Sequence, residues 1–123
     1  MLKIETTKAP GAIGPYSQGY IYNGLFYSSG QICLIPETGK LIEGGIKEQT
    51  HQVCKNIGEL LKAAGTDFSK VIKTTCFLDD MNNFGSFNEV YAQYFTSNPA
   101  RSCVAVKTLP KNVLCEIEVI AFV

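Results

Sequence analysis

Arg101 is the residue of this chain best suited to recognise a small anion. It is the only arginine among eleven basic residues, and it closely follows Pro99, where the residue pattern changes from helical to extended. A planar guanidinium matches the two oxygens of a carboxylate and donates charge-assisted hydrogen bonds to both. Arg101 is therefore a candidate carboxylate anchor. From this residue alone, an ordinary surface arginine is the alternative.

Two carboxylates, one thiol and two turns are the other candidates for chemistry. Glu116 and Glu118 alternate near the C-terminus, where a carboxylate could activate water or simply face solvent. Cys103 lies two residues after Arg101, and its side chain alone indicates an ordinary strand cysteine. The segments Gly14-Pro15-Tyr16 and Ser28-Ser29-Gly30-Gln31 favour turns first and ligand loops second.

The single histidine restricts the chemistry that the chain can perform. His51 is the only histidine, so a multi-histidine metal site is excluded, and no cysteine spacing is typical of zinc. Because His51 lies among lysines, we expect it to be solvated, which weakens a Cys–His dyad with Cys103. The phosphate-binding loop, the dinucleotide fingerprint and the G-x-S-x-G elbow are all absent from the sequence. The segment Pro99-Ala100-Arg101-Ser102-Cys103 is therefore what remains as a candidate for chemistry.

The periodicity of the apolar residues predicts the elements that position these candidates. The Asn23-Gly24 pair favours a hairpin, and Gly65 is placed to end a helix. Six strands are expected, at Leu2–Thr6, Gly19–Tyr22, Leu25–Ser29, Val71–Leu78, Ser102–Thr108 and Leu114–Phe122. Two helices are expected, one over Ile46–Ala64 and one that follows the cap candidates in Asp79–Asn83, carries Phe84, Phe87, Tyr91, Tyr94 and Phe95, and stops before Pro99.

The order β-β-β-α-β-α-β-β predicts one α+β domain over residues 1–123, with the two helices on one face of a mixed sheet. The last strand has two different sides. One is wholly apolar (Cys115, Ile117, Val119, Ala121, Val123), and the other mixes Glu116 and Glu118 with Leu114, Ile120 and Phe122. Leaving Ile120 and Phe122 in water would forgo about 1.5–3 kcal/mol each. Since two helices cannot cover both faces, we expect a homo-oligomer.

Composition narrows the partners of the chain. Eleven basic and eleven acidic residues give a formal charge of zero, which argues against nucleic acid as a general partner. No apolar run reaches the length of a membrane span, and the N-terminus lacks a signal-peptide pattern. The five cysteines show no close pair, so we expect reduced thiols in a cytoplasmic protein that does not enter a membrane.

Several segments together resemble the RidA (YjgF) family, and they cover essentially the whole chain. They are Ala12-Ile13-Gly14-Pro15-Tyr16-Ser17-Gln18, Ser29-Gly30-Gln31, Ala63-Ala64-Gly65, Val71-x-Lys73-Thr74-Thr75, Pro99-Ala100-Arg101-Ser102-Cys103-Val104-Ala105-Val106, Leu109-Pro110 and Glu116-Ile117-Glu118. The resemblance implies a chorismate-mutase-like fold that assembles as a homotrimer with ligand clefts between subunits. It also implies hydrolysis of 2-iminobutanoate, 2-iminopropanoate and 2-aminoacrylate, released by pyridoxal-phosphate dehydratases, to 2-oxo acids and ammonia without a cofactor or metal.

The same resemblance assigns roles to the candidate residues. Arg101 would bind the substrate carboxylate, and Glu116 would activate the attacking water with help from the backbone of Cys103. Tyr16, Ser29 and Gly30 would line the cleft, with Asn88 as a further substrate-binding candidate. The connection Thr96-Ser97-Asn98 is shorter than in many relatives, which affects the rim of the cleft.

Two other functions stay open at this point. A non-catalytic regulator that binds 2-oxo acids would use Arg101 in the same way, and Glu116 favours chemistry over such a sensor. An endoribonuclease or translation inhibitor is an activity attributed to some relatives. It would need a basic surface that a neutral chain with one arginine does not offer.

Overall fold

The computed structural model describes all residues from 1 to 123, and its elements follow the predicted order. The strands are β1 (Leu2–Ile4), β2 (Gly19–Tyr22), β3 (Leu25–Ser28), β4 (Val71–Leu78), β5 (Ala100–Ala105) and β6 (Cys115–Phe122). The helices are α1 (Ile46–Ala63) and α2 (Phe84–Tyr94), with single 3₁₀ turns at Phe68–Lys70, Met81–Asn83 and Pro110–Asn112.

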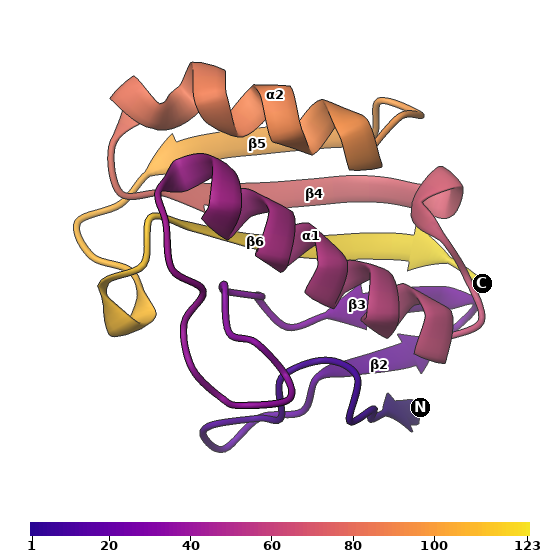
Figure 1. Ribbon diagram of the computed structural model, residues 1–123. Coiled ribbons are helices and arrows are strands. Elements are labelled where there is room, and N and C mark those ends of the chain that lie inside the picture. The colour runs from indigo at the N-terminus through magenta and orange to yellow at the C-terminus, as the bar shows by residue number, and fades with distance from the viewer.

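All six strands form one mixed sheet in the order β1-β2-β3-β6-β4-β5 (Figure 1). Neighbouring strands are antiparallel except β4 and β5, which run parallel and are joined through α2. The C-terminal strand β6 therefore lies in the middle of the sheet, and β5 forms one edge. The predicted α+β class is confirmed.

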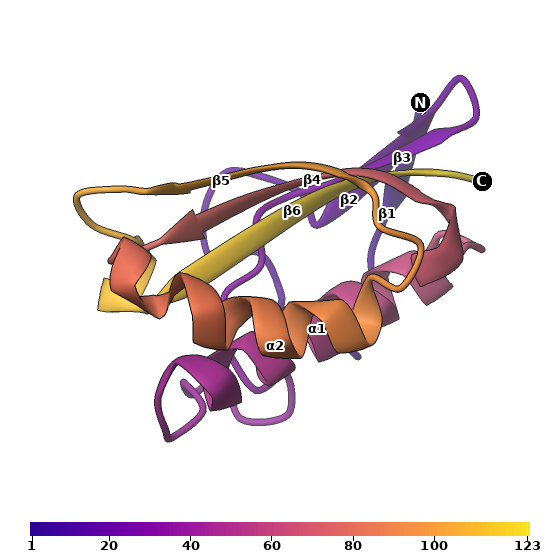
Figure 2. The same ribbon diagram turned by 90° about the horizontal axis from the view of Figure 1, so that it is seen from above.

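Both helices lie on the same face of the sheet, and the core fills the space between (Figure 2). β6 turns four fully buried side chains towards the helices, as predicted: Cys115, Ile117, Val119 and Ala121. Val123, which was expected on this buried face, is 45% exposed because it lies beyond the end of the strand. Its N–H donates to Gly24 O instead. Neither helix combines the length and apolarity needed to cross a bilayer.

The opposite face of the sheet carries no helix, as expected from the mixed side of β6 (Figure 2). Tyr27, Val104 and Phe122 are 42–48% exposed on this face. Their position follows from the pairing of Tyr27 with Ile120 and of Val104 with Phe77. Such an uncovered apolar sheet face is typical of a protein that associates with further subunits.

Two strand boundaries differ from the sequence prediction because nonlocal pairing sets them. β1 ends at Ile4 rather than Thr6, since the Thr6 N–H donates to the Gln18 side chain. β5 spans Ala100–Ala105 rather than 102–108, since these residues pair in register with residues 73–78 of β4. Arg101 consequently lies inside a strand, and the other boundaries agree within one residue.

The predicted turn residues adopt the backbone conformations that their types favour. Asn23 and Gly24 both have positive φ, 51° and 76°, which confirms the hairpin between β2 and β3. Gly65 has φ 80° and ends α1 as predicted. Asp80 caps the 3₁₀ turn by accepting from the Asn82 N–H at 2.8 Å, and α2 itself starts without a side-chain cap.

Candidate functional site

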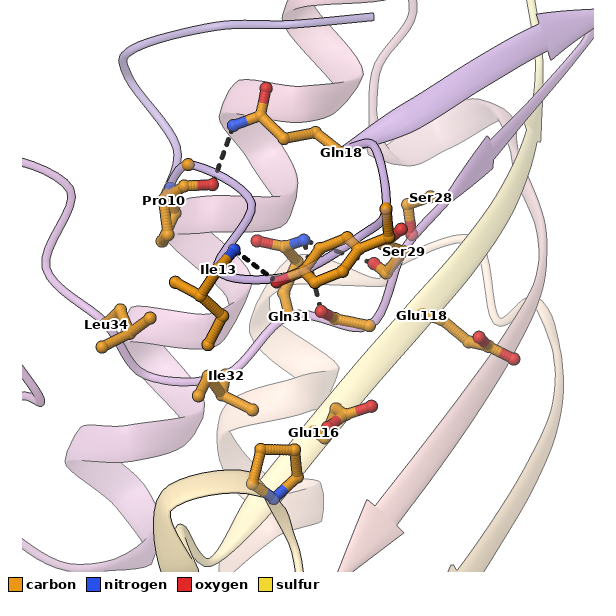
Figure 3. Close-up of a pocket in the computed structure, with 14 residues that line it drawn as sticks. Pro10, Ile13, Gln18, Ser28, Ser29, Gln31, Ile32, Leu34, Glu116 and Glu118 are labelled. Atoms are coloured by element: carbon orange, nitrogen blue, oxygen red, sulfur yellow. Dashed lines mark hydrogen bonds between the residues drawn. The ribbon is translucent and has the colours of Figure 1, made fainter. Parts of the chain in front are cut away.

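A pocket of about 510 Å³ opens beside the first half of β6 (Figure 3). Three segments form its walls: the loop after β1, the chain that follows β3, and the outward side of β6. Its lining residues are Pro10, Gly11, Ile13, Tyr16, Gln18, Ser28, Ser29, Gly30, Gln31, Ile32, Leu34, Pro110, Glu116 and Glu118. Four residues expected at the site by resemblance, Tyr16, Ser29, Gly30 and Glu116, therefore line one pocket.

Glu116 is the half-buried carboxylate of this pocket, and Glu118 lies two residues further along the same side of β6. Burial raises the pKa of Glu116 above its ordinary value, and the charge of Glu118 raises it further. A carboxyl with a raised pKa takes up and releases protons closer to neutral pH, which suits general acid–base chemistry.

Gly30 leaves the space that the Glu116 side chain occupies. The bridge between Gln31 and Ile117, with N–H to O distances of 2.8 and 3.1 Å, holds this segment against β6. A Cβ on Gly30 would lie within 2.8 Å of Glu116 Cδ and closer still to Oε2. Any other residue at position 30 therefore collides with the carboxylate.

Gly30→Ala is expected to displace the Glu116 carboxylate while leaving the fold intact, because the colliding atoms belong to the end of a flexible side chain. Activity that depends on Glu116 should fall about 10²-fold or more, since a misplaced catalytic group loses its alignment. The melting temperature should change little. Gly11→Ala is the matched control, because Gly11 lines the same pocket and a Cβ added there has no atom within 4 Å. Equal activity in the two variants would contradict the assignment.

Glu116→Gln is expected to stabilise the fold near neutral pH and not in acid. A raised carboxyl pKa means that the folded state binds its proton more tightly than the unfolded state. Stability is therefore lost as pH rises from the ordinary glutamate value through the raised one. Glutamine removes this loss, so thermal unfolding should show a higher Tm at about pH 7.5 and no gain at about pH 3.5. An equal change in Tm at both pH values would show that packing, not ionisation, is responsible.

Tyr16 and Ser29 form the rim of the pocket. The Tyr16 hydroxyl accepts a 3.2 Å hydrogen bond from the Ile13 N–H, which ties the ring to its own loop. The Ser29 hydroxyl donates to Ser17 O at 2.5 Å, and the Ser29 N–H donates to Gln18 O at 2.9 Å. Because the hydroxyl proton of Ser29 is already used, its main contribution is to hold the two walls together.

Gln18 is a residue of the pocket whose role the sequence pattern does not predict. Its buried side-chain amide accepts from the Thr6 N–H at 2.7 Å and donates to the carbonyls of Thr6 and Ala9. It also donates to the carbonyl of Pro10 at 2.8 Å (Figure 3). These bonds fix the loop that carries Pro10 and Tyr16. The only signal in the sequence was the place of Gln18 at the end of the matched segment from Ala12.

Arg101 lies elsewhere, at the edge strand β5 beneath α2. Its Nη1 donates to Asn88 Oδ1 at 2.8 Å, and its guanidinium lies 4.7 Å from the Tyr91 ring centroid and 5.4 Å from that of Phe84. No carboxylate lies within 4.0 Å of it, since the two ion pairs of the chain involve lysines only. A half-buried guanidinium without an acidic partner is a typical anion site.

Cys103 adjoins Arg101 on the same strand. Burial raises the pKa of its thiol, although the Arg101 charge opposes the shift, so a thiolate nucleophile is not favoured. The backbone of Cys103 is better placed than the thiol to contact a ligand. Val106 donates to Leu78 O, and the alternation of a parallel ladder then leaves the N–H and C=O of Cys103 at the unpaired edge of the sheet.

The Arg101 group (Arg101, Asn88, Cys103) and the Glu116 group (Glu116, Tyr16, Ser29, Gly30) do not meet within one chain. Glu116 pairs across to Phe77 and then to Val104, three residues beyond Arg101. Ordinary strand spacing and rise place the two Cα atoms about 14 Å apart. An odd number of residues also turns the side chains to opposite faces.

His51 belongs to neither group. The prediction of a solvated histidine is wrong, because His51 is half-buried and its Nδ1 is hydrogen-bonded to the Tyr94 hydroxyl at 2.9 Å. The polar side of α1 faces α2 at this point, which helical periodicity alone does not reveal. No three His, Cys, Asp or Glu side chains are arranged to hold a metal ion.

Comparison with known proteins places these features in a family. The family model described as Endoribonuclease L-PSP matches residues 6–123. The human 2-iminobutanoate/2-iminopropanoate deaminase is 53% identical over 119 residues, covering 96% of this chain and 87% of that protein. AldR of Lactococcus lactis, named as a candidate regulator, is 56% identical over 119 residues, which cover 96% of this chain and 94% of that protein. The structure of YyfA from Yersinia pestis, of the Rid family, is 53% identical with a TM-score of 0.95 and covers 98% of both chains. The chain therefore belongs to the Endoribonuclease L-PSP family, to which the RidA (YjgF) proteins belong.

Proposed function

We propose that this protein is an imine deaminase that hydrolyses 2-iminobutanoate, 2-iminopropanoate and their enamine forms, such as 2-aminoacrylate, to 2-oxo acids and ammonia. The observation that carries the proposal is the half-buried Arg101, which has no acidic partner in its own chain. The names of relatives about 50% identical over nearly the full length support the same reaction. Glu116 supplies the proton-transfer group that the reaction needs, because its raised pKa suits it to take up and release a proton.

The proposed reaction is the addition of water to a C=N bond followed by loss of ammonia. Arg101 gives one N–H to Asn88 and has further N–H donors for the substrate carboxylate. Glu116 takes a proton from the water as its oxygen bonds to the imine carbon, and the π electrons move to nitrogen. Glu116 returns the proton to that nitrogen and then takes the remaining hydroxyl proton, so that the C=O bond forms as the C–N bond breaks. Ammonia leaves and carries this last proton away as ammonium. A protonated imine is already electrophilic, so orientation and one modest base suffice.

We further propose that the sites are completed between subunits of a homotrimer. Arg101 and Glu116 of one chain direct their side chains to opposite faces of the sheet, so one chain does not bring both groups to the same substrate. The uncovered apolar face of the sheet provides a surface for association. In this arrangement Arg101 and the Cys103 backbone of one subunit close the Glu116 pocket of the next. The five unpaired cysteines fit a cytoplasmic location.

A trapping assay tests the reaction. Threonine dehydratase acting on threonine releases the imine, which semicarbazide converts to a semicarbazone. The protein should lower the rate of semicarbazone formation and raise the rate at which free 2-oxobutanoate and ammonia appear. If the wild-type protein has no effect at any concentration, the deaminase proposal fails.

Subunit complementation tests the shared site. Arg101→Ala and Glu116→Gln homo-oligomers should each be nearly inactive. After they are unfolded together and refolded as a mixture, about a quarter of the sites combine an intact arginine and an intact glutamate from neighbouring chains. Activity should therefore recover to about a quarter of the wild-type value, with a mass by light scattering of three chains of 13.5 kDa. No recovery in mixed trimers, or an active monomer, would contradict the shared site.

A regulator that binds 2-oxo acids is the second candidate, favoured by the name of the AldR relative. It would use Arg101 in the same way, without chemistry at Glu116. Calorimetry with 2-oxobutanoate together with the trapping assay separates the two functions. Tight binding without hydrolysis would assign the regulator, whereas turnover assigns the enzyme.

A further inference from the structure

One side of α2 is built around Arg101. Phe84, Asn88 and Tyr91 are spaced four and three residues apart, so they lie on the same face of the helix. All three contact the guanidinium: Asn88 Oδ1 accepts from Nη1 at 2.8 Å, and the two ring centroids lie 5.4 and 4.7 Å from Cζ. A planar cation over aromatic faces is attracted by their quadrupoles.

Tyr91 is itself fixed by contacts that do not involve Arg101. Its hydroxyl is hydrogen-bonded to Thr74 Oγ1 at 2.8 Å, and its ring stacks on Phe95 at 4.3 Å with an interplanar angle of 21°. Thr74 is the register partner of Arg101 on β4, so the Tyr91 side chain lies across this strand pair. Burial raises the pKa of Tyr91, so the phenol stays protonated at neutral pH and Tyr91 places no negative charge beside the guanidinium.

A held guanidinium has a direct consequence for ligand binding. An unconstrained arginine side chain populates many rotamers, so it loses conformational entropy when it binds a carboxylate. The Tyr91 and Phe84 ring centroids, 4.7 and 5.4 Å from Arg101 Cζ, restrict the orientation of the guanidinium before a ligand binds. They do so without neutralising its charge. An acidic partner would also hold the arginine, but it would compete with the substrate for the same donors.

We infer that Tyr91 is a positioning residue for the deaminase site, which with Phe84 sets the Arg101 guanidinium in the orientation that receives the substrate carboxylate. The inference rests on the proposed function of Arg101. It concerns a residue that contacts the substrate only through another side chain.

The main variant is Tyr91→Leu, and Tyr94→Leu is its matched control on the same helix. Tyr94 contacts His51 and Phe68 and does not touch Arg101. We expect Tyr91→Leu to raise the KM for the imine and the Kd for 2-oxobutanoate about tenfold, a factor equivalent to about 1.4 kcal/mol. The kcat should change less than twofold, and Tyr94→Leu should leave all three constants unchanged. Tyr91→Phe, which keeps the ring, should retain a KM within about twofold of wild type.

Two further variants keep the test decisive. Phe84→Leu removes the half-buried ring at the start of α2, so it tests the same role with less disturbance of the core. Arg101→Ala combined with Tyr91→Leu forms a double-mutant cycle. If Tyr91 acts through Arg101, the second substitution adds less than about twofold to the Kd of the Arg101→Ala protein.

Each outcome decides a different point. Equal Kd values for Tyr91→Leu and Tyr94→Leu, with Phe84→Leu like wild type, overturn the positioning role and leave the proposed function standing. A full tenfold effect of Tyr91→Leu in the Arg101→Ala background also overturns it. If Arg101→Ala binds 2-oxobutanoate as tightly as wild type, the carboxylate role of Arg101 fails, and the inference fails with it.

Discussion

Glu116→Gln is expected to lower kcat for imine hydrolysis by about 10²–10⁴-fold, the usual contribution of a general acid–base group. Glutamine keeps the size of the side chain but cannot take a proton from water. Binding of 2-oxobutanoate should stay within about twofold of wild type, since Arg101 binds the carboxylate in the proposed site. The trapping assay gives kcat, and calorimetry gives the Kd. An active Glu116→Gln enzyme would remove Glu116 from the chemistry.

Glu118→Gln is the matched control for this prediction, because it removes the same charge from the same side of β6. The charge of Glu118 raises the pKa of Glu116, so its removal should lower that pKa. The base form of Glu116 would then persist to lower pH. We expect a nearly normal kcat and an acid limb of the kcat/KM profile that moves to lower pH. If the acid limb of the kcat/KM profile does not shift, ionisation of Glu116 does not determine its position.

Arg101→Ala is expected to raise the KM for the imine about 100-fold or more. The guanidinium would supply two charge-assisted hydrogen bonds to the carboxylate, each worth about 1.5–3 kcal/mol. Arg101→Lys should recover only part of this loss, because an ammonium lacks the planar fork and does not lie over the Phe84 and Tyr91 rings in the same way. Initial rates over a range of imine concentrations give the constants.

Lys107→Ala is the charge control for Arg101→Ala. It removes one positive charge from an exposed residue just beyond β5. Its KM should equal that of wild type, since exposed charges act weakly on a site that they do not touch. If Arg101→Ala and Lys107→Ala raise the KM equally, general electrostatic attraction would replace the specific carboxylate contact.

Much of the fold could be predicted from local patterns. The helical period over 46–64 and the Asn23-Gly24 turn correspond to α1 and the β2–β3 hairpin because both depend on residues close in sequence. β1 and β5 were predicted with wrong ends because distant partners set them. Gln18 takes the N–H of Thr6, and β4 determines where β5 begins.

The candidate site shows the same division. Glu116, Gly30, Tyr16 and Ser29 were predicted together and share one pocket. The requirement for glycine at position 30 depends on the Glu116 side chain that packs against it, and this contact joins segments far apart in the sequence. The contacts of Tyr91 with Thr74 and Arg101 join α2 to two strands, and no spacing in the sequence reveals them.

The sequence by itself determined the chemical groups, the family motifs and the two-sided character of β6, because these depend on residue type and on alternation along one strand. Only the tertiary structure decided that the Arg101 and Glu116 groups lie apart. That separation depends on strand order: β6 lies between β3 and β4, and β5 forms the far edge. Strand order is set by packing between distant segments, so it leaves no mark in the local pattern.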